Sequence, residues 1–226
     1  MFKAVSRLNG ENNNNYAYRA IKKGIVSLEL QPGQLLSVGE LTEALRVSST
    51  PIKSALWKLQ QEHLVDIIPQ VGSYVSKINI ELIEEAASMW FNLEKEVLKL
   101  ACHCFPENHL NQLKRNLHLQ EMLVAEKEIF VDSKEWINKL HELDEQFHAI
   151  IFEGHRRSNT WKAIEQMTSN YQRMMNLTPL HYHFEQMVAE HRDVLSMIEK
   201  KEMERVESVL RSHIFRPIYD LKNESV

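Results

Sequence analysis

The chain has 226 residues, 43% of them hydrophobic and 26% charged, and its formal net charge is −4. This globular composition leaves room for two small domains, each with its own hydrophobic core. No run approaches the roughly 20 consecutive apolar residues that span a membrane, and the N-terminus lacks the apolar core and small-residue cleavage site of a secretion signal. Nothing suggests a membrane-spanning or secreted protein, and we expect a cytoplasmic protein without a membrane partner.

The first 15 residues end in Glu11 and four asparagines and show no hydrophobic periodicity. We predict a mobile N-terminal tail over 1–15. A helix is predicted over 16–28, where apolar residues recur on one side at Ala20, Ile21, Ile25 and Leu28. A turn follows at 30–34, since proline fixes its first bend and glycine tolerates the second.

Two further helices are predicted after this turn. Ser37 and Glu40 have the spacing of a capping box, so a helix begins at Ser37 and ends near Leu45. A tight connection leads to a third helix, capped by Ser48 or Ser49. Its first turn tolerates a proline at position 51.

Two β-rich runs, 64–69 and 73–78, flank a Gln70-Val71-Gly72 turn and predict a hairpin. Helix, helix, tight turn, helix and hairpin is the order of a winged helix-turn-helix domain, here 16–78. From 79 to 226 the period is close to 3.6 throughout, which predicts about six helices in a bundle. Interruptions are expected at Phe105-Pro106, near Asp132-Ser133, at Gly154 to Asn159 and at Thr178-Pro179. The predicted fold class is mainly α, with an all-helical second domain.

Charge divides unevenly between these two parts. Residues 1–77 carry nine Lys and Arg against six Asp and Glu, a balance of +3, whereas residues 78–226 have a balance of −7. A basic head on an acidic body attracts phosphate to one end only. A chance fluctuation in composition is the alternative explanation for so small a difference.

The third helix offers candidate DNA contacts in its first turn. A recognition helix lays this turn in the major groove, where hydroxyl groups and Lys can reach phosphates or base edges. The hairpin tip can touch the neighbouring DNA backbone. The candidate DNA-binding residues are Ser48, Ser49, Thr50, Lys53, Gln70 and Gly72. In the alternative interpretation the serines and the threonine only cap the helix, and Lys53 is a solvated charge.

Four residues of the body form a candidate metal site. Asp144 and His148 are four residues apart on one helix face, and His191 and His213 lie on later helices. Each has apolar neighbours at helical spacing, so all four can project inward. One carboxylate and three imidazoles suit a divalent transition metal such as Zn²⁺, Ni²⁺ or Mn²⁺. Spacing alone equally allows hydrogen-bonded core histidines, and three others serve as well: His141, His181 and His183.

The segment "LQPGQLLSVGELTEALRVSSTPIKSALWKLQQEHLVDIIPQVGSYV" resembles the DNA-binding head of GntR-family transcriptional regulators nearly end to end. The shared elements are L-x-P-G, an E-L helix, V-S-x-T-P-[VI]-[RK]-x-A-L, L-x-x-E-x-L-V and a P-x-x-G-x-x-V wing. Relatives usually have Arg where this chain has Ser49, and Arg-Glu where it has Lys53-Ser54. Because Lys lacks the bidentate fork of Arg, we expect a different operator sequence and a lower affinity per half-site.

The body resembles the FCD-type ligand-binding domain of the FadR subfamily. Asp144, His148, His191 and His213 match that domain's metal ligands one by one. The resemblance implies a metal at the base of a cavity, whose coordination is completed by a small effector, often an organic acid. Relatives usually place Arg just before an L-E pair on the first body helix. Here the segment from Met89 to Glu94 has no Arg and contains two aromatic residues, Trp90 and Phe91. These aromatic residues either line the cavity or belong to the core.

The resemblance implies a bacterial transcription regulator, a repressor, that binds palindromic operator DNA as a homodimer under effector control. Two rivals remain. One is a metabolite-binding protein with weak or lost DNA binding, as the missing Arg at Ser49 suggests. The other is a metal-dependent enzyme, which needs a general base beside the metal; Glu145 and Glu190 are near in sequence, but nothing places them there.

Overall fold

The computed structural model describes residues 5–126, 134–177 and 181–224. Its contacts divide the chain into two compact units. The first comprises Met1–Ile83 with Gln166–Leu177, and the second comprises Glu84–Glu165 with Thr178–Val226. The limits predicted from the sequence, namely 1–15, 16–78 and 79–226, stay predictions.

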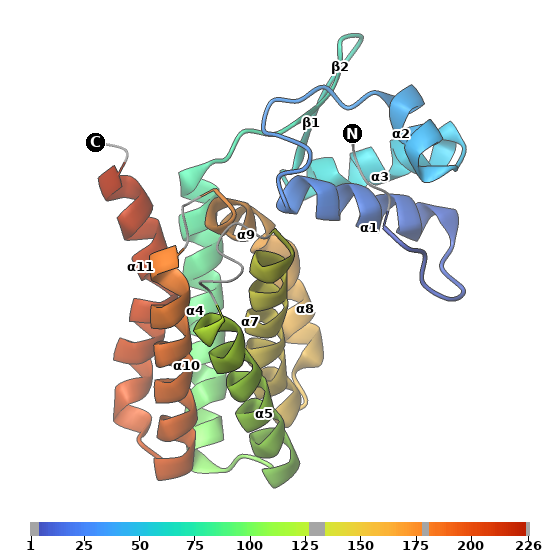
Figure 1. The fold of residues 1–226 in the computed structure, drawn as a ribbon. Helices are drawn as coiled ribbons and strands as arrows, with labels where there is room; N and C mark the ends of the chain where they lie inside the picture. Colours follow the sequence, from blue (N-terminus) through green and yellow to red (C-terminus); the bar gives the residue numbers. More distant parts are fainter. Residues whose placement is uncertain (1–4, 127–133, 178–180, 225–226) are drawn as a thin grey trace. The chain divides into compact units, whose positions relative to one another are not determined.

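The first unit contains the winged helix-turn-helix that the sequence predicts (Figure 1). The strands pair antiparallel with Val65 opposite Val75 and Ile68 opposite Gly72, and an isolated bridge joins Leu35 to Tyr74. Its elements are α1 (Asn13–Val26), α2 (Val38–Leu45), α3 (Ser49–Gln61), β1 (Val65–Ile68), β2 (Gly72–Val75) and α9 (Ser169–Met175).

Local capping sets the helix boundaries. Asn12 accepts a hydrogen bond from the Asn15 amide at 2.9 Å, so α1 begins three residues before the predicted start at Tyr16. Ser37 caps α2 as predicted, since its hydroxyl accepts from the Glu40 amide at 3.3 Å. The tight connection into α3 is made by Arg46, whose φ of 52° is left-handed.

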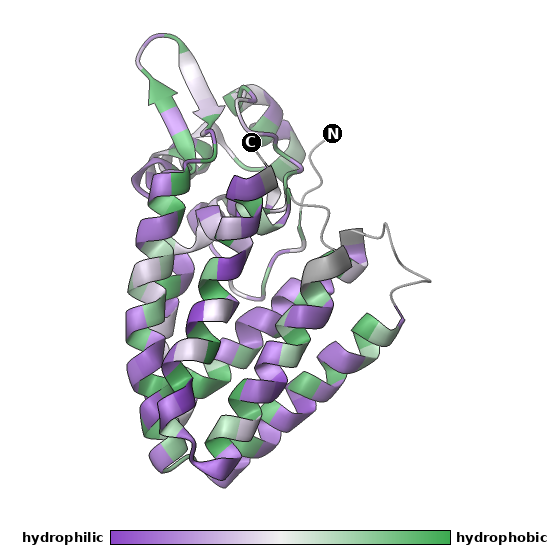
Figure 2. Ribbon diagram, turned by 90° about the vertical axis from the view of Figure 1, so that its left-hand side faces the viewer, coloured by the Kyte–Doolittle hydropathy of each residue, from purple (hydrophilic) through white to green (hydrophobic). Residues whose placement is uncertain are grey.

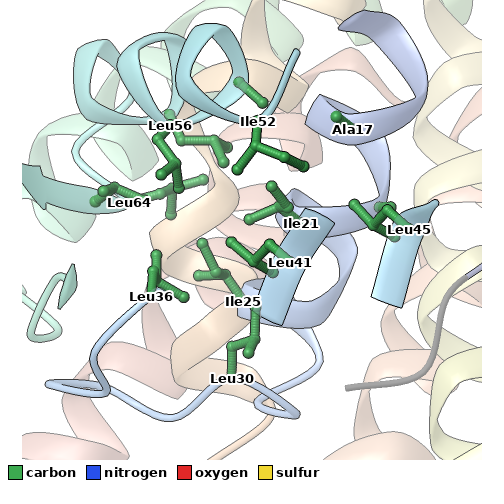
Figure 3. Close-up of a cluster of buried hydrophobic side chains, with 14 of the residues drawn as sticks. Ala17, Ile21, Ile25, Leu30, Leu36, Leu41, Leu45, Ile52, Leu56 and Leu64 are labelled. Atoms are coloured by element: carbon green, nitrogen blue, oxygen red, sulfur yellow. The ribbon is translucent and has the colours of Figure 1, made fainter. Parts of the chain in front are cut away.

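Apolar faces of the three head helices and the hairpin enclose one core (Figure 3). Ile21 and Ile25 of α1 pack there with Leu41 of α2 and Ile52 and Leu56 of α3. Full burial of such a side chain contributes about 1.5–3 kcal/mol relative to exposure. This core fixes α3, which leaves the opposite face of α3 to solvent.

Helix α9 belongs to the first unit although the helices on either side of it in the sequence lie in the second. Its Arg173 side chain is completely buried. The guanidinium donates to Ser76 Oγ at 3.1 Å, to Ser76 O at 2.6 Å and to Asn170 Oδ1 at 2.8 Å. Among the described residues no carboxylate forms an ion pair with Arg173. Burial lowers the pKa of Arg173 to about 10, so the group is a buried cation at neutral pH.

The second unit is a helical bundle, whose helices run alongside one another in Figure 1. Hydrophobic and hydrophilic residues occupy different faces of these helices (Figure 2), as a 3.6-residue period requires. None of the described helices is long and apolar enough to cross a membrane. The elements are α4 (Ile80–His103), α5 (Glu107–Ala125), α7 (Lys134–Gly154), α8 (Ser158–Met167), α10 (His181–Lys200), η1 (Met203–Arg205) and α11 (Val206–Glu224).

The predicted interruptions at Phe105-Pro106 and at Gly154 to Asn159 are present. Those near Asp132-Ser133 and at Thr178-Pro179 lie outside the described residues. Two more interruptions were missed, at Thr168 and at Lys201 to Arg205. Neither contains Gly or Pro, the residues on which the sequence prediction depended.

Candidate functional site

Three helices of the second unit bring the four predicted metal ligands together. Asp144 and His148 come from α7, His191 from α10 and His213 from α11. One ligand atom of each lies within 4.8 Å of those of the others. All three histidines are buried. The inward projection expected from helical spacing is therefore what the structure has.

Two of the four side-chain atoms that face one another have no hydrogen-bond partner among the described residues. His148 Nε2 lies 3.8 Å from Asp144 Oδ1 and 3.1 Å from His213 Nε2. His191 Nε2 lies 3.3 Å from Asp144 Oδ1, yet neither atom has a hydrogen-bond partner in the part of the chain that the structure describes. Unpaired buried polar atoms are rare and need an explanation.

The outer nitrogen of each histidine is held by a side-chain oxygen. The Nδ1 atoms lie 2.6 Å from Glu94 Oε1, 2.7 Å from Gln120 Oε1 and 3.2 Å from Glu190 Oε2, for His148, His191 and His213 respectively. Since these oxygens accept, each Nδ1 carries the hydrogen, and in the neutral ring Nε2 keeps its lone pair. Such outer contacts fix the orientation of metal-binding histidines.

Burial and neighbouring groups shift the pKa values of three of the four ligands in different directions. Burial lowers the pKa of His191 to about 4, so its imidazole is neutral near pH 7. Burial opposes ionisation of Asp144, but the imidazoles of His191, 3.3 Å from its Oδ1, and of His148 outweigh it and hold the pKa of this carboxyl well below its usual range. Burial also disfavours the charged form of His148, but the Glu94 carboxylate outweighs it and raises the pKa of this histidine.

These residues fit a divalent transition metal. Ligand atoms about 2.1 Å from a tetrahedral ion lie roughly 3.4 Å from one another. Three of the six pairs lie at 3.1, 3.3 and 3.8 Å, and all six lie within 4.8 Å. An ion at this position would satisfy the unpaired Asp144 Oδ1 and His191 Nε2. His141 is not part of the group; its ring packs on Phe184, with centroids 5.5 Å apart. The side chains of His181 and His183 lie outside the described residues.

Two aromatic residues of α4, Trp90 and Phe91, are candidates for either the cavity wall or the core. Both are buried. Trp90 also borders the site: its ring centroid lies 5.0 Å from that of His148, and its indole nitrogen donates to Glu94 Oε2. Phe91 packs instead on Phe215, with centroids 5.7 Å apart.

Sequence reasoning missed the residues that hold the histidines. Glu94 is the one carboxylate on the buried side of α4, where its neighbours are apolar. A lone charge on an apolar helix face was the signal that could have identified it. Glu190 contacts the Nδ1 side of His213, away from the ligand atoms, so it does not sit where a general base on a metal-bound water would.

The predicted DNA-contacting residues of the third helix lie together at the start of α3. Ser48, Ser49, Thr50 and Lys53 are all exposed. Ser48 is the N-cap, but its side chain makes no capping hydrogen bond. Its hydroxyl is therefore available to a partner, and the interpretation of Ser48 as a purely structural cap loses its main support.

The hairpin tip presents Gln70, which is exposed and has a left-handed φ of 63°. Gly72 is only half-exposed. A Cβ atom at Gly72 would approach Leu35 Cδ1 to 3.1 Å and the Tyr74 ring to 3.5 Å. Close packing therefore explains the glycine without any contact to DNA.

Comparison with known proteins identifies both parts. Residues 14–75 match the family of bacterial regulatory proteins, gntR family, and residues 85–216 match the FCD domain. The HTH-type transcriptional repressor RspR of Escherichia coli is 27% identical over 202 residues, 89% of this chain and 85% of the relative. An HTH-type transcriptional regulator of Streptomyces ambofaciens is 26% identical over 224 residues, 96% of this chain and 87% of the relative.

Solved structures agree on the fold. E. coli McbR/YncC has a TM-score of 0.71 at 21% identity, and the match covers 96% of this chain and 100% of that structure. A GntR regulator from Rhodococcus sp. RHA1 has a TM-score of 0.70 at 16% identity, covering 93% and 97%. With a GntR head, an FCD body and relatives that are regulators rather than enzymes, the chain belongs to the GntR family of transcriptional regulators, in the group that carries an FCD domain.

Proposed function

We propose that this protein is a transcriptional repressor of the FadR subfamily in the bacterial cytoplasm, which binds a palindromic operator as a homodimer and responds to a small effector at a divalent metal. The observation that carries the proposal is the pair of unpaired buried atoms, Asp144 Oδ1 and His191 Nε2, inside the body of a GntR regulator. The relative RspR is named a repressor, which supports the direction of control.

The metal centre is proposed on Asp144, His148, His191 and His213. A bound divalent ion supplies Lewis acidity, which attracts an oxygen ligand of the effector. Glu94, Gln120 and Glu190 orient the imidazoles from outside. Aromatic rings crowd the histidines: Phe147 stacks on His191 with centroids 4.1 Å apart, and Trp161 stacks on His148 at 5.7 Å.

These rings limit the room around the ligand atoms, so we propose that the effector is a small organic acid. The usual family arginine is absent from the first body helix, where Trp90 borders the site. The metal would therefore hold the carboxylate without an arginine from α4. A small ligand with one coordinating group suits this arrangement.

Coupling from the body to the head runs through α8 and α9 in this proposal. Trp161 of α8 stacks on His148, and α8 continues through Thr168 into α9. On α9, Arg173 holds Ser76, the residue that directly follows strand β2. A shift of the His148 ring would therefore reach the base of the wing through the Trp161 stack, the continuous chain from α8 to α9 and the hydrogen bonds of Arg173 to Ser76.

Selection from a random duplex library at about 0.15 M salt tests the DNA-binding part. We expect the intact protein to enrich a palindrome with one half-site per head. Replacing Thr50 and Lys53 together by alanine should weaken binding to the enriched duplex at least about 30-fold, because two major-groove contacts are lost in each half-site. Fluorescence anisotropy of the labelled duplex measures both affinities.

Replacing Lys139 by alanine is the matched control, since this exposed lysine lies on α7 in the second unit. It should leave operator affinity unchanged. Failure of the wild-type protein to enrich any sequence would favour the rival reading, a metabolite-binding protein whose head has lost its DNA affinity.

A further inference from the structure

Trp57 of the recognition helix is 62% exposed. Tryptophan is a large, mostly buried residue in folded proteins, and full exposure of an indole is costly. The other three tryptophans, Trp90, Trp136 and Trp161, are all at most 6% exposed. The α3 surface therefore carries an aromatic side chain that the fold itself does not use.

Trp57 lies on the same face of α3 as the predicted DNA contacts. Seven residues correspond to about two turns of α-helix, so Trp57 is displaced only roughly 20° around the axis from Thr50 and about 10 Å along it. Lys53 and Ser54 flank the line between them, and both are exposed. When the first turn of α3 enters the major groove, Trp57 follows Thr50 along the same face of the helix.

The charges around this face leave room for an apolar contact. Lys58, the next residue, has its ammonium 3.7 Å from the centroid of the Tyr18 ring, so it is turned towards α1. The hairpin, residues 65–75, contains no Lys or Arg. Its exposed large hydrophobic side chains are Ile68 at 47% and Val71 at 65%. The hairpin therefore adds no positive charge to that of Lys53.

We propose that Trp57 is a specificity-determining residue that packs its indole on the 5-methyl group of a thymine in the operator. A thymine methyl is the apolar feature of the major groove, and apolar side chains read it by contact. The proposal rests on DNA binding by the head. The partner of Trp57 is duplex DNA, because Trp57 lies on the same helix face as Thr50 and Lys53.

Thymine-to-uracil substitution in the selected duplex tests this contact, because uracil lacks only the methyl group. One thymine in each half-site should be sensitive: its replacement should weaken wild-type binding about fivefold. Trp57→Ala should weaken binding to the unmodified duplex about tenfold and should be indifferent to uracil at that position. The two changes are then not additive, which is the signature of one shared contact.

Leu8→Ala is the control, since Leu8 is 60% exposed and precedes α1. It should keep both the affinity and the uracil sensitivity of the wild type. Wild-type affinity in Trp57→Ala would overturn the proposal. Two other results would also overturn it. In the first, Trp57→Ala binds more weakly but keeps the full sensitivity to uracil. In the second, Trp57→Ala binds more weakly while uracil has no effect on the wild type, because Trp57 would then contact only the sugar-phosphate backbone. If wild-type protein selects no sequence, DNA reading itself fails and not only the role of Trp57.

Discussion

His148→Ala is expected to lower the affinity for Zn²⁺, Ni²⁺ and Mn²⁺ by more than about 100-fold. Changes to the outer contacts of a metal site already cost 10- to 100-fold, and this substitution removes a ligand atom. His148 also lies at the centre of the cluster, with its Nε2 3.1 Å from His213 Nε2 and 3.8 Å from Asp144 Oδ1. Metal content after dialysis, with native mass spectrometry, measures the loss.

Two matched variants make this result specific. His118→Ala removes an exposed histidine of α5 and should retain the full metal content. Glu94→Gln replaces the carboxylate beside His148 Nδ1 and should weaken binding by about 10- to 100-fold without abolishing it. Full metal occupancy in a folded His148→Ala protein would contradict the four-residue site.

Arg173→Met is expected to destabilise the first unit by about 2–4 kcal/mol. Methionine fills much of the same volume but donates no hydrogen bond, so Ser76 O and Asn170 Oδ1 lose the donors that Arg173 supplies. Each buried acceptor left unsatisfied costs about 1–3 kcal/mol. Urea denaturation gives the change in free energy, and amide hydrogen exchange over α9 and Ser76 shows where it acts.

The matched control is Arg115→Met, which changes an exposed arginine on α5 and should alter stability by less than about 0.5 kcal/mol. The same Arg173 variant tests coupling: it should keep its metal while operator affinity stops responding to metal. Unchanged exchange over α9 would show that Arg173 does not fasten this helix to Ser76.

The features that sequence predicted correctly depend on short-range rules. Ser37 caps α2 because a serine before an apolar helix satisfies a free amide three residues later. The hairpin follows from a glycine turn between β-rich runs. The ligand cluster was accessible because Asp144 and His148 share a helix face. Apolar neighbours made His191 and His213 two candidates among several histidines, and the family resemblance selected them.

The features that sequence could not supply depend on long-range packing. Nothing local indicates that α9 leaves the helices beside it in the sequence and packs with the head, since this depends on Arg173 meeting Ser76 across 97 positions. Gln120 likewise has no marker in the sequence; it becomes part of the site only because α5 brings its oxygen to His191 Nδ1. The sequence predicts Gly72 as a DNA contact, but close packing against Leu35 also explains why this position is a glycine.

Operator affinity measured by anisotropy in the metal-free, metal-loaded and metal-plus-organic-acid states tests the link between site and DNA most directly. At one fixed salt concentration, the account predicts that affinity for the selected palindrome changes by about 5- to 150-fold between these states, as a typical coupling free energy requires. The same titration with His148→Ala should show one affinity throughout. Equal affinity of the wild-type protein in all three states would contradict metal-dependent control of DNA binding.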